Sequence, residues 1–440
     1  MKKLIIILVL AVVLFNSCKK QAGPTTDTIA TMARDNLYGL MQDWYYWYKY
    51  LPANITVTDY KDPYTLLDAL RYKTLDRWSF VDDYNAFVAN MNGSFVGHGI
   101  RIGLDTQGKA RIVTIYKNSP LYTNGAGGPG VRRGWIIKTL NGSNLAPILA
   151  SGDATAYNNL IGASTAGITN TFVFTTPRGN DTTALTTKKS FAVNSVMLYD
   201  TLTLKTGKTG HLVFDEFIDP SVQELQTAFA FFKAQGVKDL VLDLRYNNGG
   251  ILDVATQLAG YISGKPTTSI FIKSSYNDKK AAANDTTINF ESMANPLSLS
   301  RLVVITTRET ASASEEVING LKPYLTVTTI GDTTNGKPTG MNVWQYDYTY
   351  IFAPITFELV NSAGQGDFYA GFVPSKYVPD DITRDFNDKS ELCFKEAIYL
   401  LENGTVSTKG AYIYKPSVQY SEKPSRMNNA YIFNKSFSKR

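Results

Sequence analysis

Apolar runs of two kinds alternate along the second half of the chain. The runs with the length of buried strands are residues 211–214, 240–244, 301–306, 325–330 and 355–360. The segments with apolar positions at helical spacing are residues 222–232, 251–263, 313–322 and 389–401. Strands that alternate with helices predict an α/β domain with much parallel sheet, which we assign to residues 181–405.

The pattern differs on either side of this domain. Residues 28–92 are predicted to be a small helical domain, because residues 29–51 and 64–75 show an aromatic-rich helical pattern. Residues 93–180 contain short alternating runs separated by glycine turns, which predict a β domain. Residues 406–440 are polar, tyrosine-rich and basic without a clear period. The sequence leaves open whether they form an ordered extension or a loose tail.

The first 18 residues indicate export. Lys2 and Lys3 precede an apolar run over residues 4–15, which is too short to span a bilayer comfortably. The following Phe-Asn-Ser-Cys resembles the lipobox of bacterial lipoproteins, so we predict a signal peptide over residues 1–18 and lipid attachment at Cys18. Residues 19–27 would then be a tether, and the protein would be lipid-anchored in the bacterial cell envelope, on the periplasmic or surface face of the outer membrane. The alternative is an ordinary signal peptide with an incidental cysteine.

Composition narrows the function classes. The chain has 440 residues, of which 44% are apolar, and a formal net charge of +6. The charges are interspersed, without a basic stripe or zinc-finger spacing, so no nucleic-acid partner is expected. Apart from Cys18 there is one cysteine, Cys393, which is predicted to be a small core residue.

No cofactor is expected. His98 and His211 are the only histidines and lie far apart in sequence with no cysteine pair nearby, so a metal site is not expected. The chain has no P-loop or dinucleotide fingerprint, so neither ATP nor NAD is inferred.

A serine and a lysine are the strongest candidates for chemistry. Ser312 lies between a predicted strand and a predicted helix, and Lys337 follows 25 positions later in a glycine-rich loop. A serine hydroxyl needs a base to become nucleophilic, and a buried lysine can serve because desolvation lowers its pKa. The plain alternatives are that Ser312 or Ser314 caps the helix and that Lys337 is a solvated loop residue.

Backbone N–H groups near Ser312 could stabilise an oxyanion. Gly249 and Gly250 follow the buried strand at residues 240–244 and precede a helix, where glycines permit a close backbone approach. The N–H of Ala313 is a second candidate donor. The alternative for the glycine pair is an ordinary connector.

The β domain contains a candidate peptide-binding loop. Gly97, His98, Gly99 and Ile100 precede an alternating strand, where N–H groups can face a peptide carboxylate while the peptide extends the sheet. This order resembles a PDZ domain of the bacterial protease type, although Trp135 stands where an aspartate is usual. The alternative is an ordinary glycine turn in which His98 is solvated.

Three motifs together resemble the carboxyl-terminal processing (tail-specific) serine peptidases over roughly residues 30–402. They are DLRYNNGG at residues 243–250, ASASEE at residues 311–316 and the glycine-lysine loop. The resemblance implies a ClpP/crotonase-like core, Ser312 as nucleophile, Lys337 as base and a matching glutamate at Glu315. It also implies a serine endopeptidase that cleaves exported polypeptides near apolar C-termini recruited by the PDZ-like domain.

Two departures leave the third catalytic residue open. Pro323 replaces an aspartate and Met341 a glutamine that some relatives carry, so Glu315 and Asn342 are the candidates. The departures motivate an alternative, an inactive peptide-binding lipoprotein on the same fold. A crotonase-like acyl-CoA enzyme is a further alternative, against which the export signal argues. The sequence defines neither the oligomeric state nor the physiological substrate.

Overall fold

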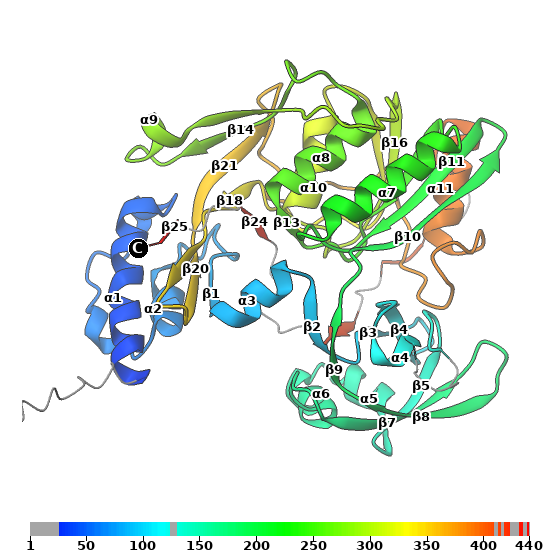
Figure 1. Ribbon diagram of the computed structural model, residues 1–440, viewed down its shortest axis with the longest axis horizontal. Helices are drawn as coiled ribbons and strands as arrows, with labels where there is room; N and C mark the ends of the chain where they lie inside the picture. The colour runs from blue at the N-terminus through cyan, green and yellow to red at the C-terminus, as the bar shows by residue number, and fades with distance from the viewer. Residues whose placement is uncertain are drawn as a thin grey trace, which may run out of the picture.

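The structure is a computed structural model that describes residues 26–123, 130–408, 412–414, 418–422, 431–433 and 438–439. The predicted signal peptide, Cys18 and almost all of the tether lie outside the described residues. Figure 1 shows N-terminal helices on one side, a large α/β core beside them and a smaller β domain below the core. No helix in the described part of the chain is both long and apolar enough to cross a membrane.

The chain forms eleven α-helices and twenty-five strands over the described ranges. The α-helices are α1 (Thr26–Trp44), α2 (Pro63–Leu70), α3 (Tyr84–Met91), α4 (Pro120–Thr123), α5 (Leu145–Ala150), α6 (Ala154–Ile161), α7 (Ser221–Ala234), α8 (Leu252–Ser263), α9 (Ala281–Asn284), α10 (Ala313–Leu321) and α11 (Leu392–Asn403). The strands up to the core are β1 (Phe80–Asp83), β2 (Ser94–Gly97), β3 (Ile100–Leu104), β4 (Ala110–Ile115), β5 (Ile136–Leu140), β6 (Ser143–Asn144), β7 (Thr169–Thr175), β8 (Asp181–Thr187) and β9 (Lys189–Ala192). The later strands are β10 (Val196–Leu204), β11 (Gly207–Phe214), β12 (Asp239–Asp243), β13 (Gly249–Ile251), β14 (Ile270–Tyr276), β15 (Thr286–Asn289), β16 (Arg301–Thr306), β17 (Thr326–Gly331), β18 (Thr339–Met341), β19 (Trp344–Tyr346), β20 (Tyr350–Ala353), β21 (Ile355–Asn361), β22 (Lys376–Tyr377), β23 (Gln419–Ser421), β24 (Tyr431–Phe433) and β25 (Ser438–Lys439).

The core is built on a six-stranded sheet of order β10-β11-β12-β16-β17-β22, parallel from β11 onward. Its central strands are apolar on both faces because both faces are covered. Leu242 and Val304 belong to the large hydrophobic core that includes residues of α7, α8 and α10. Val241 and Ile305 point the other way and pack with Phe394 of α11. This arrangement explains the unbroken apolar runs of the sequence.

A second six-stranded sheet, of order β13-β24-β18-β21-β14-β15, lies beside the first (Figure 1). The parallel strands β12 and β16 end close to this sheet, and their carboxyl ends lead into the DLRYNNGG and ASASEE segments. The candidate catalytic segments therefore meet between the two sheets, as expected for loops at the carboxyl edge of a parallel sheet.

The β domain has its own core beneath a sheet of order β23-β3-β4-β5-β7-β8. This sheet extends past the boundary predicted at residue 180, because β8 pairs with β7 along its whole length. The Pro-Arg-Gly-Asn segment at residues 177–180 is the turn of this hairpin rather than the end of the domain, and the N–H of Gly179 donates to the Thr176 carbonyl (2.9 Å).

The N-terminal helices share one hydrophobic core with the α/β sheets, and β1 pairs with β20. The second helix is shorter than predicted, since α2 ends at Leu70 and not near residue 75. Arg71 adopts an extended backbone, and the N–H of Tyr72 donates to the Tyr45 hydroxyl (3.0 Å) instead of continuing the helix. Tertiary hydrogen bonding overrides helical propensity at this point.

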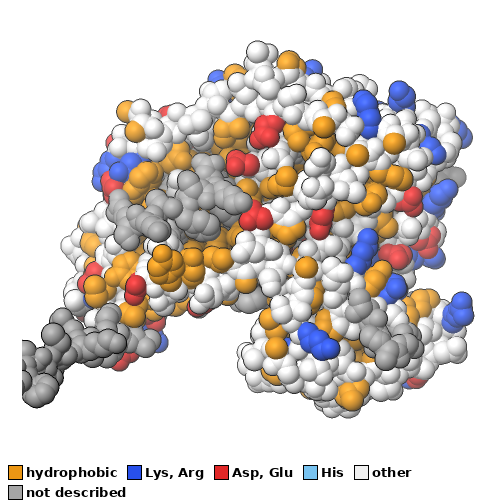
Figure 2. Space-filling view, in the orientation of Figure 1, with side chains coloured by type: hydrophobic (Ala, Val, Ile, Leu, Met, Phe, Trp, Pro, Cys, Tyr) orange, Lys and Arg blue, Asp and Glu red, His pale blue; other side chains and the backbone are white. Residues whose placement is uncertain are grey.

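The C-terminal residues add single strands to three different sheets. β23 extends the β domain, β24 lies between β13 and β18, and β25 pairs with β19. Figure 1 shows them in red against the earlier parts of the chain. On the face drawn in Figure 2, acidic side chains gather near the centre and basic ones mostly near one edge, with apolar side chains between them.

Candidate active site

Ser312 stands at the junction between the turn after β16 and the first residue of α10. It is fully buried, and its backbone has φ 59° and ψ −115°, a conformation that a residue with a side chain rarely adopts. Such strain costs about 1–3 kcal/mol and tends to occur at functional sites. Among the described residues, the Ser312 Oγ has no hydrogen-bond partner. Ser312 is also the N-cap residue of α10 and shares a capping box with Glu315, so the helix-cap alternative holds in part and does not by itself exclude a reactive hydroxyl.

Ser314 differs from Ser312 in this respect. Its Oγ donates to the main-chain carbonyl of Asn247 (3.0 Å), so the hydroxyl joins the ASASEE turn to the DLRYNNGG loop. Ala311 adds a second hydrogen bond between the same two segments, because its N–H donates to the Asn247 carbonyl (3.1 Å). Ser314 thus has a structural partner, and Ser312 is the serine left with an unengaged hydroxyl.

Glu315 connects the serine segment to the lysine loop. Its Oε2 accepts from the N–H of Ser312 (2.8 Å) and of Lys337 (2.9 Å). Its Oε1 accepts from the N–H of Gly336 (2.6 Å) and the hydroxyl of Thr334 (2.5 Å). The carboxylate therefore positions Lys337 through its backbone, and burial raises the pKa of Glu315 against the lowering effect of these donors.

Lys337 is fully buried, and the solvated-loop alternative is wrong. Desolvation lowers the pKa of its amine to about 7, while the charges of Asp76 and Glu315 act in the opposite direction. A lysine with this pKa is partly neutral near pH 7 and can accept a proton, which an ordinary lysine cannot.

Asp76 and its neighbours were missed by the sequence analysis because they lie far away in the sequence, in the connection between α2 and β1. Its carboxylate accepts from the hydroxyl of Tyr45 (2.7 Å) and from the N–H of Trp78 (3.0 Å) and Ser79 (2.9 Å). The Trp78 Nε1 donates to Asn335 Oδ1 (3.0 Å), two residues before Lys337. The N-terminal domain therefore covers the lysine loop, and no local sequence signal indicates this.

The two glycines proposed as oxyanion donors have different surroundings. The Gly249 N–H donates to Asn247 Oδ1 (2.9 Å), so this donor is already engaged. The Gly249 carbonyl and the Ile251 N–H both pair with Phe217. Because alternate residues of a strand face opposite edges, the N–H of Gly250 faces the other edge, towards β24. Gly250 is therefore the candidate donor of the pair, and its N–H faces the edge that β24 occupies in this structure.

The second candidate donor lies at the start of a helix. Ala313 is the first residue of α10, where N–H groups have no acceptor inside the helix and favour negative charge. Gly250 must be glycine, since its φ is 140° and an added Cβ would lie 2.0 Å from the Phe217 carbonyl oxygen. The approach of this backbone to the site depends on the missing side chain.

Asn342, the alternative third residue, is engaged elsewhere. Its Oδ1 accepts from the Thr356 hydroxyl (2.7 Å), and its N–H donates to the same oxygen (2.9 Å). Met341 is buried and opposes Ile355 of β21. Of the two proposed third residues, Glu315 is the one that accepts hydrogen bonds from both the serine and the lysine segments.

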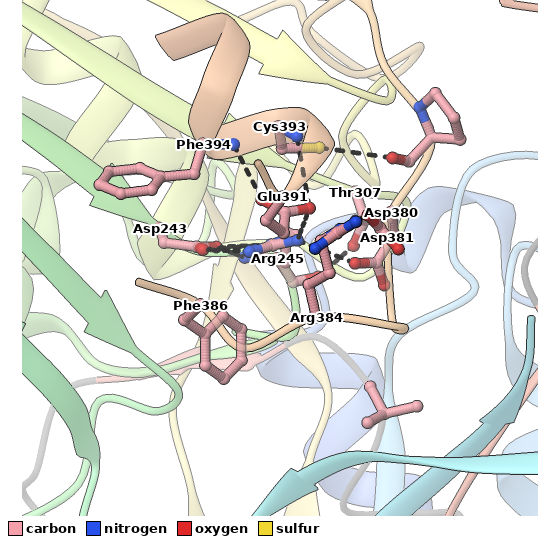
Figure 3. Close-up of polar contacts among 12 residues, drawn as sticks. Asp243, Arg245, Thr307, Asp380, Asp381, Arg384, Phe386, Glu391, Cys393 and Phe394 are labelled. Atoms are coloured by element: carbon pink, nitrogen blue, oxygen red, sulfur yellow. Dashed lines mark hydrogen bonds and ion pairs between the residues drawn. The ribbon is translucent and has the colours of Figure 1, made fainter. Parts of the chain in front are cut away.

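A buried charge cluster supports the DLRYNNGG loop. Arg245 forms ion pairs with Asp243 (2.7 Å), Asp380 (2.9 Å) and Glu391 (3.0 Å), and Figure 3 shows its guanidinium lying between these carboxylates. Arg133 of the β domain also pairs with Asp380 (3.0 Å). Breaking one partner of such a buried network is costly, so the cluster fixes the loop that precedes Gly249.

The candidate peptide-binding loop is built as a set of inward-facing N–H groups. The N–H groups of His98 (2.9 Å) and Ile100 (3.2 Å) donate to the carboxylate of Glu422. Gly99 has φ 74°, and an added Cβ would lie 2.3 Å from the Ser119 Cβ. The prediction that His98 is solvated is wrong: the ring is buried, packs on Phe172 and bonds Asn170 Oδ1 (2.7 Å).

The remaining candidates have structural surroundings. His211 is buried and stacked on Phe394, and desolvation lowers its pKa to about 4. Cys393 is buried in the core packed around α11. Within the described ranges no group of three or more His, Cys, Asp or Glu side chains could hold a metal ion.

Comparison with known proteins finds that two parts of the chain match models of one peptidase family. Residues 208–374 match the profile of peptidase family S41, and residues 33–80 match the peptidase S41 N-terminal domain. A protein assigned as a CtpA-like serine protease in Staphylococcus aureus is 27% identical over 282 residues, which are 64% of this chain and 50% of that protein. One from Staphylococcus saprophyticus is 25% identical over 255 residues, 57% of this chain and 47% of that protein. The chain spans about half the length of the curated relatives it matches.

Among solved structures, a protein assigned as an S41 protease from Bacteroides fragilis has the same fold. The TM-score is 0.68 at 23% identity, and the match covers 84% of this chain and 97% of the other. This similarity confirms the predicted α/β fold class.

Proposed function

We propose that this chain is a serine peptidase with Ser312 as nucleophile and Lys337 as general base, because residues 208–374 and 33–80 match the domains of peptidase family S41. One observation carries this proposal: a single buried carboxylate, Glu315, accepts from the backbone N–H of both residues. The unengaged Ser312 Oγ and the lowered pKa of Lys337 add the reactive oxygen and the proton acceptor.

The proposed reaction is acyl transfer. Neutral Lys337 takes the proton from the Ser312 Oγ as this oxygen attacks the carbonyl carbon of a peptide bond. The N–H groups of Gly250 and Ala313 donate to the resulting oxyanion. The lysine ammonium then protonates the leaving amine. A water molecule, deprotonated by Lys337 in turn, attacks the acyl-enzyme, and the ammonium returns the proton to the Ser312 Oγ as the ester bond breaks.

We further propose that the substrates are exported polypeptides, cleaved near their C-termini after recognition by the PDZ-like β domain. The N–H groups of His98 and Ile100 support this step, since they already hold a carboxylate. The lipobox-like segment before Cys18 supports anchoring at the cell envelope, where such substrates would be met.

The test is digestion of an unfolded protein such as casein by the unaltered chain and three variants. Ser312→Ala and Lys337→Ala should each lower kcat/KM by at least about 1000-fold, whereas the matched control Ser314→Ala should keep most of the activity. Circular dichroism verifies that each variant folds. Undiminished cleavage by the folded Ser312→Ala variant refutes the proposal.

A second candidate function is a peptide-binding protein without turnover, which the replacements at Pro323 and Met341 favour. The two functions differ in the reactivity of Ser312. An electrophilic serine probe, mapped by mass spectrometry, should label Ser312 in the unaltered chain and fail to do so in Lys337→Ala if the protein is a peptidase. Peptide binding without labelling in either protein would favour the binding function.

A further inference from the structure

The C-terminal extension of this chain forms an added edge strand on the β domain. β23 runs antiparallel to β3, with Tyr420 opposite Ile102 and Ser421 opposite Arg101. The ladder continues to Val418, whose carbonyl accepts from the N–H of Leu104 (3.0 Å). A segment more than 300 residues later in the chain thus supplies the strand that an extended peptide ligand would supply.

The strand ends at the loop predicted to hold a peptide carboxylate. Glu422 directly follows β23, and its Oε2 accepts from the N–H of His98 and of Ile100. The Glu422 side chain is 2% exposed, and its other oxygen lies 3.8 Å from the Lys188 amine, which is equally buried. The Glu422 carboxylate is desolvated and is held by two N–H groups near an ammonium. These are the groups that a carboxylate-binding pocket provides.

β23 also runs in the direction expected of a bound peptide whose carboxylate lies in the loop. Because β23 is antiparallel to β3, it runs towards the loop at the start of β3 and delivers its carboxylate there. The carboxylate belongs to a side chain, so the chain need not end at this point. It continues to β24, which pairs in parallel with β13, Ile432 lying opposite Gly250, and with β18.

β24 occupies the edge to which the Gly250 N–H points. A peptide that reaches this donor must lie along the same edge of β13, next to the strand that follows Lys337. One C-terminal segment therefore fills both the groove of the β domain and the edge of the candidate active site.

We propose that residues 418–422 and 431–433 are an internal ligand of this protein: the first strand fills the peptide groove with Glu422 in place of a terminal carboxylate, and the second covers the Gly250 edge. External peptides that present an extended strand followed by a carboxylate compete with the first strand for the same groove. The filling of the groove follows from the pairing of β23 with β3 alone. The covering of the Gly250 edge, in contrast, rests on the proposed function.

A tethered ligand is a strong competitor. Short flexible links give effective concentrations of about millimolar, so a peptide that binds the open groove at about 10–100 µM would bind the filled groove about 10–100-fold more weakly. Weakening the internal strand should restore this affinity.

The experiment measures binding of a fluorescein-labelled peptide of residues 414–422 with a free carboxyl terminus, by fluorescence anisotropy. All proteins are full chains that carry Ser312→Ala, so the measurement does not depend on peptidase activity. The test variant combines Tyr420→Pro, which removes a ladder donor, with Glu422→Gln, which removes the charge. Glu402→Gln, at the end of α11, is the matched control.

The test variant should bind the peptide at least about tenfold more tightly than the unaltered chain, and Glu422→Gln alone should give part of this gain. The Glu402→Gln control should not differ from the unaltered chain. The same peptide with Gln in place of its final Glu and an amidated end should not bind. Equal affinity for the unaltered chain and the folded test variant, or no binding to either, overturns the proposal.

A second measurement reports on the Gly250 edge. In chains that retain Ser312, the electrophilic serine probe should label a variant with Ile432→Pro, in β24 opposite Gly250, faster than the unaltered chain. Labelling at one rate in both overturns the part concerning this edge. Absence of labelling in both would instead refute the proposed peptidase function, while the anisotropy result still decides whether the groove is internally filled.

Discussion

Replacing Lys337 by methionine should make the protein more stable and inactive at the same time. The amine is fully buried, and desolvation lowers its pKa from 10.5 to about 7. That lowering corresponds to a destabilisation of the native state by about 5 kcal/mol when the amine is fully charged. At pH 7, where the native amine is half protonated, the destabilisation is about 4 kcal/mol. Methionine has similar length without charge, and imperfect packing should offset part of the gain. We expect Lys337→Met to raise the free energy of unfolding by about 2–4 kcal/mol at pH 7.

The gain must also depend on pH in one direction. Between the native and unfolded pKa values the unfolded state binds more protons, so the lysine protein becomes more stable as pH rises. The advantage of Lys337→Met should therefore be greatest at or below pH 7 and disappear as pH approaches 10.5.

Guanidinium denaturation at several pH values measures this difference. Both proteins carry Ser312→Ala to remove self-digestion, and Lys395→Met, at an exposed position of α11, is the matched control. A Lys337→Met variant with no gain at any pH, or with a gain that does not change with pH, would refute the reasoning that burial depresses this lysine.

kcat/KM for a peptide substrate should rise with pH and level off above about 7, because only neutral Lys337 accepts the serine proton; a flat profile across roughly pH 5–9 would contradict this assignment. Glu315→Gln should lose about 2–4 kcal/mol of stability and at least tenfold in activity, since an amide donor would face backbone donors; unfolding curves and initial rates measure both, and a stable, fully active variant would argue against the bridging role. Gly250→Ala should abolish activity and lower Tm sharply because its Cβ has no room beside Phe217, whereas Gly236→Ala, with open space around it, should cost about 1 kcal/mol; similar Tm values for the two would exclude the clash.

The sequence predicted the elements that apolar periodicity defines strongly. The helix expected at residues 313–322 is α10 (Ala313–Leu321), and the strand expected at residues 301–306 is β16 (Arg301–Thr306). Their patterns are clear because both faces of the sheet are buried. The short strands β18, β19 and β20 were not predicted, since three or four residues contain too little periodicity to indicate a strand.

For the site, the sequence predicted the segments that form it, but not which of their polar groups are already hydrogen-bonded within the protein. Gly249 and Gly250 look equivalent in the motif, yet the Asn247 side chain takes the N–H of the first. Asp76 and Glu422 act on the lysine and on the peptide loop from opposite ends of the chain. Such contacts arise from tertiary packing, and neither residue lies in a pattern that points to its partner.

The contact between Trp78 and Asn335 bears on which fragments of this protein could be functional. The residues around Asp76 shield the loop that holds Lys337, so a fragment lacking the N-terminal helices would let water reach the amine. Rehydrated, the amine would regain the proton affinity of an ordinary lysine and stay charged at neutral pH. A transplanted α/β core could thus hold every motif in register and still lack a neutral lysine, which would make the N-terminal residues part of the proposed catalytic unit rather than an accessory to it.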